Sequence, residues 1–125
     1  MNRFGKRSEQ RLIGVHKDLV KVVRRALEIS EVDLSVIEGV RLLSRQKELV
    51  AKGKSKTMNS RHLTGHAIDV VPYPLDWNDI ASFKKVGQAM KQASKELNID
   101  IEWGGDWRTF KDYPHYQLSW GKYPK

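Results

Sequence analysis

The chain has 125 residues, a length that fits one domain with a buried core of its own. It contains no cysteine, which excludes disulfides, zinc fingers and thiol nucleophiles and restricts any zinc site to His, Asp or Glu ligands. The formal net charge of +8 favours polyanionic partners, either nucleic acid or an anionic cell envelope.

The amino-terminal segment shows no export or membrane signal. Residues 1–10 are mostly polar and charged and lack the apolar stretch of a signal peptide. No window approaches the ~18 apolar residues that span a bilayer. We therefore expect a protein made in the cytosol, which needs a separate route of release if it acts elsewhere.

The first half of the chain predicts a helix, a strand and a shorter helix. Apolar residues recur at helical spacing from Leu19 to Leu27, as in an amphipathic helix that faces a core. Residues 34–41 are rich in β-branched side chains and predict a strand. Ser44 is the expected cap of a helix over residues 45–51, and the basic stretch 52–59 is expected to form a loop at the rim of a cleft.

The second half predicts a strand, a long helix and two short strands. Residues 67–71 read as a strand ended by Pro72 and Pro74. Asp76 is the expected cap of a helix with an apolar stripe at Ile80, Phe83, Val86, Met90, Ala93 and Leu97. Residues 99–103 and 115–118 are candidates for short strands. Without regular βαβ alternation, we expect one α+β domain over residues 1–125, with helices packed on a small antiparallel sheet.

Two short signatures carry the chemistry. Residues 60–69 read Ser-Arg-His-Leu-Thr-Gly-His-Ala-Ile-Asp, and residues 112–115 read Asp-Tyr-Pro-His. Together they offer two imidazoles and one carboxylate as metal ligands, and one further carboxylate. Catalytic zinc commonly takes three protein ligands and keeps one position open, while a separate carboxylate accepts the proton of the attacking water. The pattern indicates a small zinc hydrolase with its metal in a surface cleft.

Local geometry supports His62, Asp69 and His115 as the ligands. In a strand, Asp69 shares one face with Ala67, whose small side chain leaves room for a metal. His62 lies upstream in a turn that runs into this strand, and His115 begins the last strand. Asp112 lies three residues before His115, close enough to reach the attacking water.

Other residues near these signatures have two interpretations each. His66 is four residues after His62, but Gly65 and the absence of Glu at position 63 argue against a helical metal motif. It is more readily a residue that lines the cleft or packs at the strand start. Arg41 is either a cation that stabilises an oxyanion or a surface arginine paired with a carboxylate. The aromatic residues near the carboxyl end divide between core and site: Trp103, Trp107, Tyr113, Tyr116 and Trp120.

The order Ser-x-His-x-x-Gly-x-Ala-x-Asp, followed by an acidic residue three before a His, resembles the D-alanyl-D-alanine metallopeptidase family. Its phage endolysin branch cuts the L-alanyl–D-glutamate bond of peptidoglycan. Residues 4–8, 39–41, 76–79 and 103–107 are also similar to that branch, so the resemblance covers nearly the whole chain.

The resemblance implies zinc held by His62, Asp69 and His115, with Asp112 as general base and Arg41 polarising the scissile carbonyl. Many members carry Glu at the base position, so the shorter Asp here leaves Asp106 and Glu102 as alternative bases. The expected substrate contacts are Ser60, Gln46, His66 and Trp107.

The implied function is a monomeric zinc endopeptidase that cuts the stem peptide of the bacterial wall and lyses the host. It would stay in the host cytoplasm until released to the wall or periplasm, where its basic surface suits the anionic envelope. Two alternatives remain open. One is a D-alanyl-D-alanine carboxypeptidase, and the other is a non-enzymatic protein that binds wall or nucleic acid. Nucleic-acid binding leaves the Asp-x-x-His arrangement without a role, so we expect no nucleic-acid partner.

Overall fold

The computed structural model describes residues 4–55, 60–109 and 111–124. Within these residues the chain forms helices, two short 3-10 helices (η) and one antiparallel sheet. In chain order the elements are α1 Lys6–Arg11, α2 Lys17–Ile29, β1 Asp33–Glu38, α3 Leu43–Ala51, η1 Arg61–Thr64, β2 Ala67–Tyr73, α4 Ile80–Leu97, β3 Ile101–Trp103, η2 Gly104–Asp106 and β4 His115–Leu118. The predicted α+β class is confirmed.

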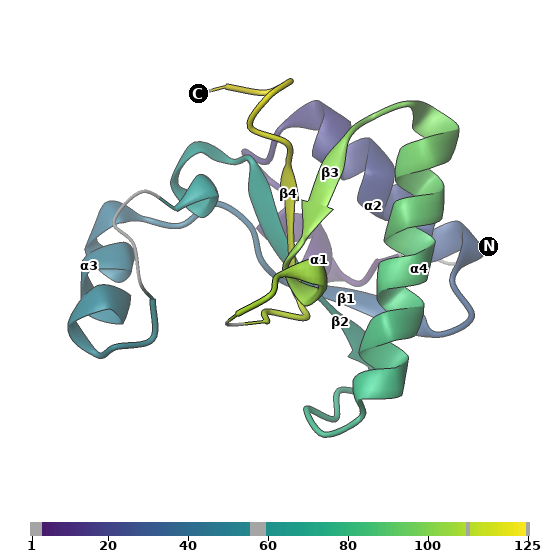
Figure 1. Ribbon diagram of the computed structural model, residues 1–125, viewed down its shortest axis with the longest axis horizontal. Helices are drawn as coiled ribbons and strands as arrows, with labels where there is room; N and C mark the ends of the chain where they lie inside the picture. Colours follow the sequence, from purple (N-terminus) through teal and green to yellow (C-terminus); the bar gives the residue numbers. More distant parts are fainter. Residues whose placement is uncertain (1–3, 56–59, 110, 125) are drawn as a thin grey trace.

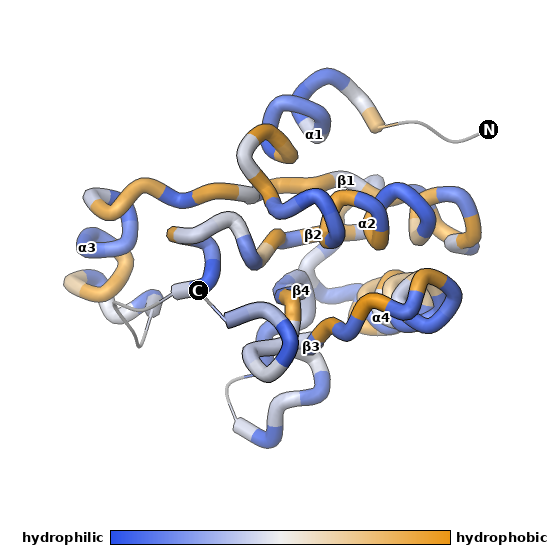
Figure 2. Tube along the Cα trace, turned by 90° about the horizontal axis from the view of Figure 1, so that it is seen from above, coloured by the Kyte–Doolittle hydropathy of each residue, from blue (hydrophilic) through white to orange (hydrophobic). Residues whose placement is uncertain are grey.

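The sheet has the strand order β1-β2-β4-β3, and each neighbouring pair is antiparallel. Helices α2 and α4 pack against each other beside the sheet, whereas α3 projects at the opposite end of the molecule from α4 (Figure 1). Strand β1 is mostly hydrophobic along its length, whereas hydrophobic and hydrophilic segments alternate along α2 (Figure 2). The apolar residues predicted for one face of α2 are all buried: Leu19, Val22, Val23, Ala26 and Leu27.

Helix α4 begins three residues later than the predicted cap at Asp76 implies. Its cap is Asp79, whose side chain accepts a hydrogen bond from the backbone N–H of Ser82 at 3.2 Å. Asp76, the predicted cap, accepts from the N–H of Asn78 at 2.9 Å in the preceding turn. Of the predicted stripe, Phe83, Val86, Met90 and Ala93 are buried, whereas Ile80 and Leu97 at the two ends are more open.

Other boundaries also differ from the sequence prediction, and strand β3, expected over residues 99–103, begins only at Ile101. Strand β1 ends at Glu38 after an irregularity in its pairing with β2, so Arg41 lies beyond the strand. Helix α3 begins at Leu43, with Leu42 rather than Ser44 at the cap position. Strand β2 continues through Pro72 to Tyr73, because β4 pairs only with residues 67–69 and leaves Pro72 a strand neighbour on one side. The loop predicted over residues 52–59 lies partly outside the described residues.

Candidate metal centre

Strands β2 and β4 turn one face to the helices and the other to a cleft. Ile68 pairs with Tyr116 and belongs to the core with it, and neither is exposed. The next pair, Asp69 and His115, alternates to the opposite face because successive side chains of a strand point to opposite sides. The pairing register therefore puts two of the three predicted ligands side by side on the cleft face.

The third ligand, His62, comes from the short helix η1 before β2. Ser60 caps this helix by accepting a hydrogen bond from the backbone N–H of His62 at 3.2 Å. Gly65 ends it with φ of +77°, and a Cβ at this position would lie 2.5 Å from the carbonyl oxygen of Gly14. Glycine is thus required at position 65 both for the backbone conformation and for the close approach. This turn directs the buried His62 toward Asp69.

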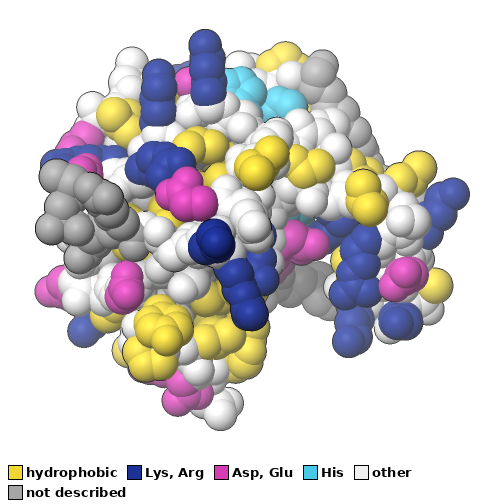
Figure 3. Space-filling model, turned by 180° about the vertical axis from the view of Figure 1, so that it is seen from behind, with side chains coloured by type: hydrophobic (Ala, Val, Ile, Leu, Met, Phe, Trp, Pro, Cys, Tyr) yellow, Lys and Arg dark blue, Asp and Glu magenta, His cyan; other side chains and the backbone are white. Residues whose placement is uncertain are grey.

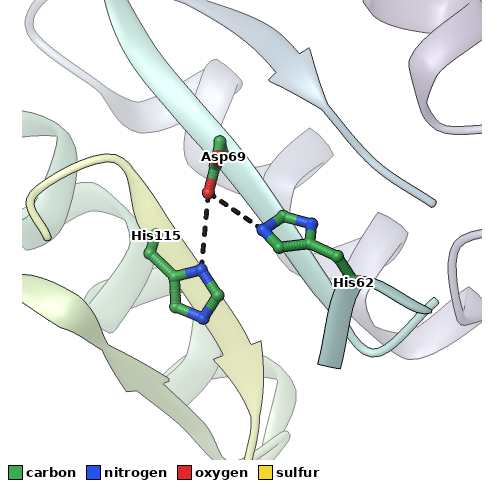
Figure 4. Close-up of side chains that lie close together, drawn as sticks. All are labelled: His62, Asp69 and His115. Carbon is green, nitrogen blue, oxygen red and sulfur yellow. Dashed lines mark hydrogen bonds and ion pairs between the residues drawn. The ribbon is translucent and has the colours of Figure 1, made fainter. Parts of the chain in front are cut away.

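The three side chains converge on one point (Figure 4). Asp69 Oδ1 lies 3.2 Å from His62 Nε2 and 3.4 Å from His115 Nδ1. The three potential ligand atoms all lie within 4.8 Å of one another, the only group of this kind among the described residues. Two imidazole nitrogens and one carboxylate oxygen are the kind of donor set that a catalytic metal site with an open position uses.

The outer ring nitrogens show that this cluster fits a cation. His62 Nδ1 lies 2.8 Å from the backbone carbonyl oxygen of Gly39, which only accepts hydrogen bonds, so this nitrogen donates. His115 Nε2 similarly donates to Gln117 Oε1 at 2.7 Å. In the neutral rings the inner nitrogens then carry lone pairs, which face the Asp69 carboxylate without a proton between them. These three acceptors repel one another, and a metal ion bound between them would replace that repulsion with attraction. The hydrogen-bond partners of the outer nitrogens fix the orientation of both rings.

The electrostatics keep Asp69 ionised. Burial alone would raise the pKa of its carboxyl, but when the imidazoles of His115 and His62 are protonated, their hydrogen bonds and positive charges outweigh that effect. They hold the pKa well below its usual range. A carboxyl group must be deprotonated to ligate a metal, and Asp69 meets this condition, whereas protons on the two imidazoles must leave before a metal can bind.

Asp112 lines the same cleft at the end of a tight loop. Its backbone N–H donates to the carbonyl of Gly104 at 3.0 Å, and its own carbonyl accepts from the N–H of His115 at 3.1 Å. A Cβ at Gly104 would lie 2.2 Å from the Asp112 carbonyl oxygen, so the loop closes only over a glycine. Partial burial and the negative charge of Asp69 raise the pKa of the Asp112 carboxyl. This environment suits a group that takes up and returns a proton.

Arg41 lies in the cleft wall and is held by two side chains. Its Nε donates to Glu38 at 3.1 Å, Nη2 donates to the other oxygen of Glu38, and Nη1 donates to Gln46 Oε1 at 2.7 Å. The structure is compatible with both interpretations of Arg41. The side chain is paired with the carboxylate of Glu38, and it also lines the cleft that contains the candidate metal centre. Among the described residues, three of its five N–H groups are used in these bonds, and two remain for another partner.

The cleft has a volume of about 920 Å³ and contains the whole predicted catalytic set. Ser60 and Trp107 also line it, and the Trp107 ring lies 5.3 Å from the His115 ring. Gln46 is fully buried beneath Arg41. His66 is not among the residues that line the cleft, and its Nδ1 lies 2.7 Å from Thr64 Oγ1. The structure thus brings Ser60 and Trp107 to the metal centre and places His66 outside the cleft lining.

Comparison with known proteins identifies the family of this chain. The family model described as "Phage L-alanyl-D-glutamate peptidase" matches residues 1–119. The chain belongs to this family. The L-alanyl-D-glutamate peptidase of Escherichia phage T5 is 41% identical over 127 residues, which cover 97% of this chain and 92% of that protein. The peptidase of the same name from Listeria phage A118 is 35% identical, over 80% of this chain and 36% of its own length.

A solved structure agrees with this assignment. The crystal structure of the Serratia marcescens L-Ala D-Glu endopeptidase ChiX superposes with a TM-score of 0.93 and 48% sequence identity. The match covers 99% of this chain and 95% of that one. At this similarity the fold is shared from end to end, and the family resemblance seen in the sequence motifs is confirmed. No described helix of this peptidase combines the length and apolar character needed to cross a membrane.

The two alternative bases lie outside the cleft lining. Asp106 forms an ion pair with Lys91 at 2.8 Å on an exposed surface. Glu102 accepts a hydrogen bond from Gln117 Nε2 at 3.3 Å. Asp112 therefore remains the only acidic residue, apart from the candidate ligand Asp69 and the arginine-bound Glu38, among the described side chains that line the cleft.

Sequence reasoning missed the residues that orient the ligands. Gln117 lies two residues after His115, on the same face of β4, and this spacing could have revealed it. The carbonyl of Gly39 and the carboxylate of Glu38 left no comparable signal, because their roles depend on how β1 pairs with β2. The peptidase thus has a second layer of groups behind its candidate metal ligands.

The aromatic residues divide as the sequence allowed. Trp103 is a core residue: its ring stacks on that of Tyr116, and its Nε1 donates to the carbonyl of Tyr113 at 2.7 Å. Trp107 and Trp120 line the cleft instead. Trp120 also covers the guanidinium of Arg61, whose carbon lies 3.9 Å from the ring centre.

Proposed function

We propose that this peptidase is a zinc endopeptidase that hydrolyses the L-alanyl–D-glutamate bond in the stem peptide of bacterial peptidoglycan. The observation that carries the proposal is the set of three inward-facing ligand atoms on His62, Asp69 and His115, each imidazole fixed from behind by a hydrogen-bond acceptor. Zinc is the metal that most often takes such a set with an open position, and when bound it activates water and polarises a carbonyl.

Asp112 is the general base in this proposal. Its carboxylate takes the proton of the water that attacks the scissile carbonyl, and it returns that proton to the leaving amine of the glutamate residue. The raised pKa of its carboxyl brings it closer to the operating pH than an ordinary Asp, which favours both transfers. The short side chain of Asp suffices because the tight loop at Gly104 presents it in the cleft beside the ligands.

Arg41 stabilises the negative charge that develops on the carbonyl oxygen. Glu38 and Gln46 hold the guanidinium in place, so its remaining N–H groups are already oriented before substrate binds. Groups that need no reorientation during the reaction stabilise a transition state most effectively. We assign Gln46 this supporting role.

Ser60 and Trp107 are the proposed substrate contacts. The Ser60 hydroxyl accepts from the backbone of His62 and keeps its own O–H free to donate to a peptide carbonyl. Trp107 offers an apolar wall beside His115. A substrate contact by His66 stays a prediction.

The cellular role follows from this reaction. We propose that the protein acts as a monomer on the cell wall after release from the host cytoplasm, and that cutting stem peptides lyses the host. Its net charge of +8 favours the anionic envelope.

The decisive experiment is a digest of purified muropeptides, with and without a chelator, read by mass spectrometry. We expect products cut after L-alanine, their disappearance in chelator and their return with added zinc. Release of terminal D-alanine instead would support the carboxypeptidase alternative. Digestion that continues in chelator after zinc has been shown to be removed would exclude the zinc mechanism.

A further inference from the structure

The cleft carries more positive charge than its catalytic chemistry uses. Five basic side chains line it: Arg41, Arg45, Lys54, Arg61 and Lys111. In Figure 3 a hollow separates the lobe that carries α3 from the rest of the molecule, and basic side chains gather along the lobe. Each of these charges either has a partner within the protein or remains for a ligand.

The three arginines are engaged. Arg41 is paired with Glu38, and Arg45 with Glu48 at 3.1 Å. Arg61 is buried, donates to the carbonyls of Leu118 and Tyr123 and lies against the Trp120 ring. The two lysines differ from them, since neither forms an ion pair with an acidic side chain in the described part of the chain.

Lys111 is the better placed of the two lysines. Its ammonium group donates to the carbonyl of Gly105 at 3.1 Å, a neutral partner that holds the side chain without neutralising it. Its neighbour in sequence is Asp112, the proposed donor of a proton to the leaving amine. Lys54 lies in the turn after α3, a different wall of the cleft.

The substrate supplies a matching charge beside that amine. A glutamate residue acylated on its amine carries two carboxyl groups, and a linear peptide continues through only one of them. The other is free, and it is joined to the leaving nitrogen through a few bonds. If Asp112 protonates the amine as proposed above, this carboxylate lies within a few bonds of the atom that Asp112 contacts.

We propose that Lys111 binds the free carboxylate of the glutamate residue and makes the peptidase selective for the ionised over the amidated form. This inference rests on the proposed function. Because Lys111 is exposed, we expect the selectivity to have the size of a solvent-exposed ion pair and to decline as salt is added.

The test compares two synthetic stem peptides that differ only in this carboxylate, which is free in one and an amide in the other. The wild-type enzyme loaded with zinc should prefer the free acid by about fivefold in kcat/KM. Lys111→Gln should lose this preference through slower cleavage of the free acid alone, and Lys111→Arg should retain it. Lys84→Gln, an exposed change on α4 outside the cleft lining, is the matched control and should behave as wild type.

Several outcomes would overturn the inference alone: equal cleavage of both peptides by wild type, an equal loss on both in Lys111→Gln, or loss of selectivity in Lys54→Gln but not in Lys111→Gln. Failure of the wild type to cut either peptide after L-alanine would instead overturn the proposed function, and the inference with it.

Discussion

The two faces of strands β2 and β4 are built from adjacent residues but held by different forces. On the helix face Ile68, Val70, Tyr116 and Leu118 have no exposed surface, and burial of apolar area stabilises them. On the cleft face the lone pairs of His62 and His115 meet a carboxylate, an arrangement that a cation completes. The comparison teaches that one face secures the fold while the other stays dependent on a ligand.

Removing a ligand gives the largest expected effect on activity and separates the two faces. In His115→Ala we expect loss of zinc and of measurable hydrolysis, because two ligands no longer make a catalytic site. Metal content and muropeptide cleavage measure the outcome.

The matched change on the helix face is Leu118→Ala, three residues along the same strand. It should lower the free energy of unfolding by about 2–5 kcal/mol through a core cavity, while the folded fraction still binds zinc. If Leu118→Ala abolished zinc binding in the folded protein, or His115→Ala kept full zinc, the two faces would not be separable.

Asp112→Asn gives the next largest effect, because it separates chemistry from binding within the cleft face. The amide cannot accept a proton, so turnover should fall by roughly 10²–10⁴-fold while zinc content stays unchanged. Single-turnover hydrolysis and metal analysis test both statements. Zinc loss would make Asp112 a ligand, and unchanged turnover would transfer the base role to Asp106 or Glu102.

Gln117→Leu tests the layer behind the ligands. Leu cannot accept the hydrogen bond from His115 Nε2, so the ring loses its orientation, and zinc affinity should fall roughly 10–100-fold. Competition with a chelator of known affinity measures the change. Unaltered affinity, with a thermal midpoint near that of wild type, would show that His115 is oriented by the strand alone.

How far the sequence predicted this site depends on how local each feature is. His62, Asp69 and the turn at Gly65 lie within ten consecutive residues, so their spacing limits their geometry. The structure brings His115 to them only through the pairing of β4 with β2. The partners of the outer nitrogens depend on that register and on the path of β1, which no short motif encodes.

The fold shows the same division between local and tertiary signals. The apolar stripes of α2 and α4 are strong periodic patterns and predicted both helices. Helix α1 was missed because it has only six residues, of which only Ser8 is buried, so it shows no periodic apolar pattern. The cap of α4 was misplaced because residues 76–79 hold Asp at 76 and 79 and Asn at 78, all suitable caps. Tertiary packing selects among them.

The smallest expected effect is a shift in pH dependence, and it sharpens the contrast between the two carboxylates of the cleft face. Asp112 must be ionised to accept a proton, so turnover should fall as pH decreases through its pKa. Burial and the charge of Asp69 raise that pKa in the metal-free protein, and the positive charge of bound zinc would lower it, so the acid limb of the zinc enzyme should lie at lower pH than the metal-free pKa. Asp69 should not produce this limb, because its own pKa is held well below the usual range.

Arg41 provides the means to assign this limb. Its positive charge acts to lower the pKa of Asp112, so Arg41→Met should move the acid limb of kcat to higher pH, in addition to slowing turnover. Profiles measured at saturating zinc keep metal loss from contributing, since protonation of the histidines also releases metal at low pH. Asp112→Asn, measured at its residual rate, should lack the limb altogether. If the limb persisted there unchanged, the titrating group would be another residue, and the contrast between the two carboxylates would fail.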